Sequence, residues 1–146
     1  DPYSETFLIL ADRNEHIDKV IKPALKRNQN ILSDRYIDST FAYQGAGRGI
    51  DQKELEYLMR LLNFPKPDLT IYLDLPVEEG LNRVKKRGKS DRFEKEDLIF
   101  FERIRNFYLD LVKKNPERFL LIDASKSTDE VFNLAKDSIT NKLYGK

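Results

Sequence analysis

The 146-residue sequence contains no cysteine and a single histidine, His16. Without cysteine, these residues form no disulfide, carry no thiol nucleophile and hold no cysteine-ligated zinc. One histidine is too few for a multi-histidine metal site, and it argues against a histidine-based catalytic triad. The chemistry therefore has to come from carboxylates, guanidinium groups, amines, amides and hydroxyls.

The sequence also lacks a long apolar run and a signal peptide. No apolar stretch approaches the length needed to cross a membrane, and no charged, apolar and small-residue leader opens the chain. We therefore expect a soluble, cytoplasmic protein with no membrane partner. The chain begins at Asp1 without an initiator methionine, as a truncated, processed or incompletely recorded chain would.

A charge excess of either sign is missing as well. The chain carries 26 Lys and Arg against 25 Asp and Glu, a net charge of +1. This balance argues against a general nucleic-acid binder, which would carry a clear basic excess. Basic clusters in such a chain are expected to serve one small anion. The length and a 40% hydrophobic content are typical of a single domain with a real core.

Hydrophobic spacing predicts helices that alternate with strands. Pro23 should kink or split the first helix, Asp51 can cap a later one, and Ser127 or Thr128 can cap the last. The expected helices cover residues 4–27, 39–44, 52–62, 76–86, 94–114 and 128–143. The expected strands cover residues 30–33, 69–75 and 119–123.

This alternation favours an α/β fold with a parallel sheet. The strands at 69–75 and 119–123 are apolar nearly throughout, which is typical of buried parallel strands. Ligands in such sheets bind beyond the carboxyl ends of the strands, here near Asp34, Leu75 and Asp123. Three strands make a thin sheet for this many helices, which hints at missing strands.

Asp34 and Arg35 form the first candidate constellation. An aspartate at a strand end can orient water on magnesium, and the planar fork of an arginine can bind phosphate. The alternative is a surface ion pair in a loop. Since loops at strand ends often carry ligands, the position favours a functional role.

Ser39, Tyr43 and Gln44 form the second constellation, with Ser39 one helical turn before Tyr43. The Gln44 amide offers a donor and an acceptor, which suits a pyrimidine edge, and a tyrosine ring can pack on a sugar or a base. Taken singly, each residue is more simply explained by packing or by a helix-end hydrogen bond.

A basic stretch around Gly88 forms the third constellation. Mobile basic loops can close over phosphates and supply charge during transfer. The alternative is a solvated basic helix end that is favourable to the helix dipole. The basic residues are Arg83, Lys85, Lys86, Arg87, Lys89 and Arg92.

Arg13, which could reach over the sheet edge to a base, is a weaker candidate, since a pair between Asp12 and His16 is the better explanation of that helix surface from the residues alone. A phosphate loop of the form Gly-x-x-x-x-Gly-Lys-Ser/Thr is absent from the 146 residues. The glycine-rich stretch at 45–49 lacks its lysine and hydroxyl, and it follows no strand directly. We interpret it as a turn.

Together these segments resemble the thymidylate kinase family of the bacterial type. LADRNEH at 10–16 is similar to the helix that carries the base-contacting arginine, and DRYIDSTFAYQG at 34–45 is the most specific match. PDLTIYLD at 67–74 resembles the following strand, while residues 87–94 and 100–103 resemble the basic lid and the next helix. The likeness runs nearly from end to end.

The resemblance implies a three-layer P-loop NTPase fold like that of nucleoside monophosphate kinases, with helices on both faces of a parallel sheet. Residues 1–146 would form a single domain with a basic lid at about 87–94. The implied reaction transfers the ATP γ-phosphoryl group to dTMP and gives dTDP, with Mg²⁺. The expected partners are these nucleotides and a second copy in a homodimer, without nucleic acid.

The resemblance also implies roles for single residues. Asp34 would lie near magnesium, and Arg35 would bind the acceptor phosphate and serve catalysis. Arg13 and Gln44 would contact thymine, while Tyr43 would pack near the sugar and disfavour a ribose hydroxyl. The full set implied to bind substrate is Arg13, Arg35, Ser39, Tyr43 and Gln44.

The resemblance also assigns the binding of ATP to four other residues. Arg92 and Arg87 would reach across the lid to the phosphates as catalytic groups, with Arg87 also binding ATP. Ser125 and Lys126 would hold the adenine.

Two departures from the family pattern stand out. Ile9 occupies the position where the family places a phenylalanine that stacks on thymine, so stacking at this position is not expected. The family's first strand, phosphate loop and second strand should precede Asp1, and the chain alone is then expected to be inactive. The alternative is a non-catalytic nucleotide-binding fragment. A deoxynucleoside kinase fits the Tyr43-Gln44-Gly45 match less well.

Overall fold

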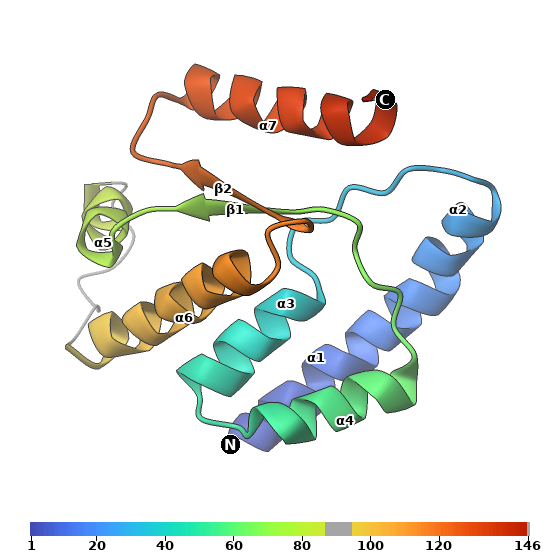
Figure 1. The fold of residues 1–146 in the computed structure, drawn as a ribbon. Helices are drawn as coiled ribbons and strands as arrows, with labels where there is room; N and C mark the ends of the chain where they lie inside the picture. The colour runs from blue at the N-terminus through green and yellow to red at the C-terminus, as the bar shows by residue number, and fades with distance from the viewer. Residues whose placement is uncertain (87–94, 146) are drawn as a thin grey trace. The chain divides into compact units, whose positions relative to one another are not determined.

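The computed structural model describes residues 1–86 and 95–145, which fall into two compact units, Asp1–Pro65 and Lys66–Lys146 (Figure 1). Each unit is described by itself. Within the described ranges, no helix combines the length and the apolar character needed to span a membrane. The predicted lid residues Arg87 and Arg92 lie outside the described residues.

The first unit opens with a long helical segment that changes from π- to α-helical hydrogen bonding next to Pro23. Helix α1 (Pro2–His16) is capped by the Asp1 carboxylate, which accepts from the backbone N–H groups of Tyr3 and Ser4. A π-helical turn, η1 (Ile17–Ile21), leads into α2 (Lys22–Lys26), where Pro23 lies in the first turn. Because proline has no N–H and its ring crowds the preceding turn, the helix changes pitch there.

The predicted strand at 30–33 is wrong. This segment has no strand geometry, and the side chains of Ile31 and Leu32 are 39% and 88% exposed. A strand requires a neighbouring strand for its backbone hydrogen bonds, and the sheet within the described residues contains only β1 and β2. The apolar pair Ile31-Leu32 is therefore part of an exposed connection rather than of the short strand predicted.

The remaining helices of the first unit pack against α1. Helix α3 (Ile37–Thr40) continues into a π-helical segment, η2 (Phe41–Gly47), so the predicted short helix is confirmed and extended. Helix α4 (Gln52–Leu62) has its predicted bounds and its Asp51 cap. The core of the unit consists of Leu10, Ile17, Ile21, Met59 and Phe64, with Tyr36, Ile37, Phe41, Leu58 and Leu62 packed around it.

The second unit is built on the predicted parallel pairing. Strand β1 (Thr70–Asp74) pairs with β2 (Phe119–Asp123), in a register that sets Asp74 beside Asp123. Figure 1 shows the two strands between α6 (Lys95–Lys114) and α7 (Thr128–Tyr144), with α5 (Val77–Lys86) next to α6. Ser127 and Glu130 form a reciprocal capping box that begins α7.

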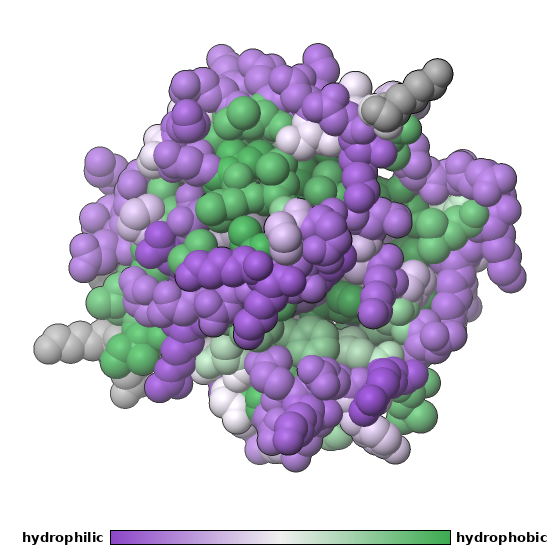
Figure 2. All heavy atoms as spheres, viewed as in Figure 1, coloured by the Kyte–Doolittle hydropathy of each residue, from purple (hydrophilic) through white to green (hydrophobic). Residues whose placement is uncertain are grey.

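Burial of this sheet is less complete than its apolar sequence predicts. Tyr72 stacks on Tyr108 of α6 with ring centroids 4.7 Å apart, and Ile122 is 3% exposed. Leu73 and Leu121 are nevertheless about half exposed, and Phe132 on α7 is 63% exposed. Figure 2 shows hydrophobic atoms at the surface in the region of α7 and the strands. A sheet of two strands is too narrow to bury the apolar faces of the helices that pack on it.

Candidate functional site

A cavity of about 480 Å³ lies in the first unit, between α1 and the segment from Arg35 to η2. All five residues that the sequence suggested for substrate binding line it. The lining residues are Glu5, Leu8, Ile9, Asp12, Arg13, Arg35, Ser39, Thr40, Tyr43 and Gln44.

Helical spacing explains how two distant segments contribute so many side chains. On α1 the pairs Leu8 with Asp12 and Ile9 with Arg13 lie one turn apart, so they share one face. The same spacing joins Ser39 to Tyr43 along α3 and η2. Figure 1 shows α3 beside α1, which brings the two faces together.

Arg35 is held in an unusual backbone conformation at the edge of the cavity. Its φ of 61° lies in the left-handed region, where a non-glycine residue carries a conformational cost. Its Nη2 donates to the Tyr43 hydroxyl at 2.6 Å, and the guanidinium carbon lies 4.2 Å from the centre of the Tyr43 ring. Arg35 is exposed, so one side of its guanidinium can meet an anion in solution.

Gln44 is almost fully buried, at 4% exposure, and its amide is fixed by a residue that the sequence did not single out. The Nε2 of Gln44 donates to Oε1 of Glu5 at 2.8 Å. The second oxygen of Glu5 lies 3.6 Å from Nε of Arg48. Glu5 lies two helical turns before Arg13 on α1, and this spacing is the only signal that could have indicated it.

Arg13 is half-buried and lines the same cavity. Its guanidinium carbon is 5.7 Å from the centre of the Tyr36 ring. Burial raises the pKa of the Tyr36 hydroxyl, against the opposing effect of the positive Arg13. Arg13 thus shares this part of the first unit with a partly buried tyrosine and lines the cavity. Ile9, at the position where the family pattern has a stacking phenylalanine, also lines the cavity and presents an aliphatic side chain there.

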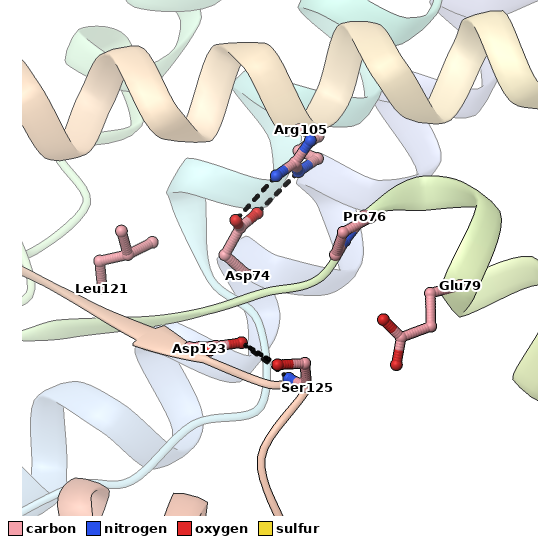
Figure 3. Close-up of a pocket in the computed structure, with 7 residues that line it drawn as sticks. All are labelled: Asp74, Pro76, Glu79, Arg105, Leu121, Asp123 and Ser125. Atoms are coloured by element: carbon pink, nitrogen blue, oxygen red, sulfur yellow. Dashed lines mark hydrogen bonds and ion pairs between the residues drawn. The ribbon is translucent and has the colours of Figure 1, made fainter.

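A second cavity, of about 510 Å³, lies in the other unit at the carboxyl ends of β1 and β2 (Figure 3). Asp74 at the end of β1 forms a bidentate ion pair with Arg105 of α6, with both N–O distances at 2.9 Å. The Arg105 hydrogen bonds hold the pKa of the Asp74 carboxyl below its usual value, although partial burial acts in the opposite direction. Arg105 is thus engaged within the fold.

The end of β2 is ordered by Ser125. Asp123 accepts hydrogen bonds from the backbone N–H and hydroxyl of Ser125, at 2.9 and 2.7 Å. The Ser125 hydroxyl, followed by its backbone N–H, lowers the pKa of the Asp123 carboxyl. Ser125 lines the second cavity, whereas the neighbouring Lys126 is exposed and is not among the lining residues.

Comparison with known proteins identifies the family of the chain. Residues 1–135 match the sequence profile of the family "Thymidylate kinase". The chain belongs to the thymidylate kinase family. This result confirms the resemblance of residues 10–16 and 34–45.

Individual relatives agree with this assignment. A thymidylate kinase from Acinetobacter baumannii (strain AYE) is 46% identical over 132 residues, 90% of this chain and 66% of that protein. One from Pseudomonas syringae pv. tomato is 43% identical over 129 residues, 88% of this chain and 61% of that protein. The chain thus spans somewhat under two thirds of the length of these relatives.

A solved structure supports the fold. The crystal structure of thymidylate kinase from Ehrlichia chaffeensis superposes with a TM-score of 0.75 at 32% identity, covering 96% of this chain and 65% of that one. The α/β fold class of P-loop NTPases is therefore confirmed, and the small parallel sheet of β1 and β2 belongs to it.

Within the thymidylate kinase fold, Asp34 is the residue suggested for magnesium. It is exposed, directly precedes Arg35 and does not line the first cavity. In the described part of the chain, no group of three or more His, Asp or Glu side chains is arranged to hold a metal ion. Magnesium often uses only one or two carboxylates together with substrate phosphates, and a single carboxylate is compatible with that arrangement.

The basic stretch divides between structural and undescribed residues. Arg83 donates to the Ala124 carbonyl at 3.0 Å and pairs with Glu79 at 2.7 Å, so it joins α5 to the end of β2. Lys85 and Lys86 are exposed in the last turn of α5. Arg87, Lys89 and Arg92 lie outside the described residues.

Proposed function

We propose that this chain carries the acceptor site of a kinase that transfers the γ-phosphoryl group of ATP to dTMP and gives dTDP. The observation that carries the proposal is the first cavity, which gathers a guanidinium at its edge, a buried amide and a second arginine in its wall. These are the groups that a pyrimidine nucleoside monophosphate requires. The family of the chain supports the same substrate.

Each end of the acceptor would meet a different part of the cavity. Arg35 would bind the 5′-phosphate through charge-assisted hydrogen bonds. Tyr43, with its hydroxyl 2.6 Å from Nη2 of Arg35, would pack on the deoxyribose. Ser39 lies one turn before Tyr43 and would complete that side. Arg13 and Gln44 would contact the thymine edge.

In the proposed transfer, the phosphate of dTMP is the nucleophile. One oxygen of the dTMP phosphate forms a bond to the γ-phosphorus while the bond from that phosphorus to the β–γ bridging oxygen breaks, releasing ADP. Positioning and charge neutralisation supply most of the catalysis in such transfers. Asp34 would help to hold magnesium, which supplies positive charge to the phosphates when bound.

The ATP side rests on the family resemblance. Arg87 and Arg92 would approach the transferred group, and Ser125 and Lys126 would border the adenine. Arg92→Ala would then lower turnover more than dTMP affinity.

A cytoplasmic location, a homodimer and a single domain over residues 1–146 are further parts of the proposal.

Calorimetric titration of the chain with nucleotides tests the acceptor site. We expect dTMP to bind, dAMP not to bind, and Arg13→Ala to weaken dTMP binding by about tenfold, the scale of one hydrogen bond to a charged group. Arg60→Ala is the matched control, since Arg60 is exposed on α4 and does not line the cavity. Absence of dTMP binding, or equal binding of dAMP, would overturn the proposal.

A further inference from the structure

The buried amide of Gln44 can present either its oxygen or its nitrogen to a ligand, and these two choices recognise different bases. An amide oxygen accepts a hydrogen bond and an amide nitrogen donates one. Thymine carries a donor at N3, whereas cytosine carries an acceptor at N3 and an amine at C4. The rotamer of one amide therefore decides which pyrimidine the cavity prefers.

Glu5, which is not among the residues expected to touch the substrate, restricts the rotamer of the Gln44 amide. An ionised carboxylate only accepts hydrogen bonds, so the Gln44 amide must turn Nε2 toward it, as the 2.8 Å contact shows. Arg48, with Nε 3.6 Å from the other carboxylate oxygen, keeps a positive charge on that side. Gln44 is 4% exposed, which leaves little room for water to replace Glu5.

We infer that Glu5 is a positioning residue that sets the polarity of the Gln44 amide and thereby selects thymine over cytosine. With Nε2 held by Glu5, Oε1 is the amide atom left to accept from thymine N3–H. Arg13, which only donates, then suits the thymine carbonyl and repels the cytosine amine. This inference rests on the proposed dTMP site.

The substitution Glu5→Gln tests this role because it keeps the shape of the side chain. Its amide can donate to Gln44 as well as accept, so the Gln44 amide is no longer restricted to one rotamer. We expect dTMP affinity to fall roughly three- to tenfold, the value of one hydrogen bond, while dCMP affinity does not fall. The selectivity ratio, defined as the dissociation constant of dCMP divided by that of dTMP, should therefore fall toward one.

A double-mutant cycle separates positioning from a general effect. Competition titrations with dTMP and dCMP are compared for the full chain and its Glu5→Gln, Gln44→Leu and doubly substituted variants. The change in ratio caused by Glu5→Gln should vanish in the Gln44→Leu background, because coupled residues are not additive. Glu15→Gln is the control, because it removes the same charge from α1 at an exposed residue that pairs with Lys19 at 3.3 Å and does not line the cavity.

Each result decides the inference. The inference is supported if Glu5→Gln lowers the ratio of the dCMP to the dTMP dissociation constant and does so only when Gln44 is present. An unchanged ratio, an equal loss for both nucleotides, or a loss that persists in the Gln44→Leu background overturns it while leaving the dTMP site intact. If the unsubstituted chain binds no dTMP, the proposed function fails first. Circular dichroism of each variant confirms that the helices are retained.

Discussion

Arg35 combines a costly backbone conformation with a side chain that is well placed for an anion. Its left-handed φ of 61° is one that glycine adopts readily. Its guanidinium lies over the Tyr43 ring and donates to the Tyr43 hydroxyl. Strained residues concentrate at functional sites, and this conformation directs the guanidinium along the cavity edge.

Arg35→Ala should weaken dTMP binding by about ten- to hundredfold, because a charge-assisted contact to phosphate is lost. The fold should be retained, since Arg35 is exposed. Calorimetry measures the affinity and circular dichroism measures the helicity. Arg27→Ala is the matched control, since the Arg27 side chain is exposed, donates to Gln29 and does not line the cavity. Equal affinity in the two variants would remove Arg35 from the phosphate-binding role.

At this scale the sequence indicated the cavity residues better than their interactions. Local chemistry made Arg13, Ser39 and Gln44 only candidates, and the resemblance of residues 10–16 and 34–45 to the thymidylate kinase family turned them into expected substrate contacts. Glu5 could not be singled out, because its importance comes from a hydrogen bond to a residue 39 positions away. A single sequence contains no sign of that contact, and an exposed glutamate on a helix is usually only a solvated charge.

Among the elements, β1 and α6 are joined by the bidentate pair between Asp74 and Arg105. The side chains are 17% and 27% exposed, respectively, so the pair is only partly screened by water. The pKa of Asp74 is lowered in the folded state. The stabilisation is therefore present above the unfolded-state pKa of about 3.9 and is lost as the pH falls through the lower folded-state pKa.

Asp74→Asn should lower the free energy of unfolding at pH 7 by about 2 kcal/mol, since charged hydrogen bonds are replaced by weaker ones. The difference from the parent chain should shrink below about pH 4. Urea unfolding at several pH values measures both effects. Asp110→Asn on the exposed surface of α6 is the control. A destabilisation that is the same at all pH values would contradict an ionic role for this pair.

Element boundaries followed the sequence where the signal was local. The strand at Phe119–Asp123 and the helix at Gln52–Leu62 have their predicted bounds, because apolar runs and an aspartate cap mark them. Residues 30–33 failed because a short apolar segment becomes a strand only beside another strand. The π-helical pitch of η1 and η2 was also not predicted, since no residue type specifies it.

For the molecule as a whole, the expected activity of the 146 residues depends on a phosphate loop that their sequence does not contain. The 146 residues contain no lysine-bearing loop to hold the β- and γ-phosphates of ATP. The first cavity nevertheless lies entirely within Asp1–Pro65. Binding of the acceptor and transfer of the phosphoryl group should therefore be separable.

The purified chain, given ATP, Mg²⁺ and dTMP, should form no detectable dTDP although it binds dTMP. Joining the same residues to the phosphate-loop segment of a relative should produce turnover, measured by a coupled assay of ADP release. The fused protein with its phosphate-loop lysine replaced by alanine is the control and should stay inactive. Turnover by the 146-residue chain alone would contradict this division of roles.

The π-helical segment η2 has a consequence for how this region tolerates changes in chain length. Tyr43 and Gln44 lie in η2, just after α3. Each residue of a helix turns the chain by a fixed angle, so deleting Ala42 would rotate both side chains relative to Ser39 and Thr40. Substitutions that keep the length can preserve the cavity, whereas insertions and deletions between residues 40 and 43 cannot.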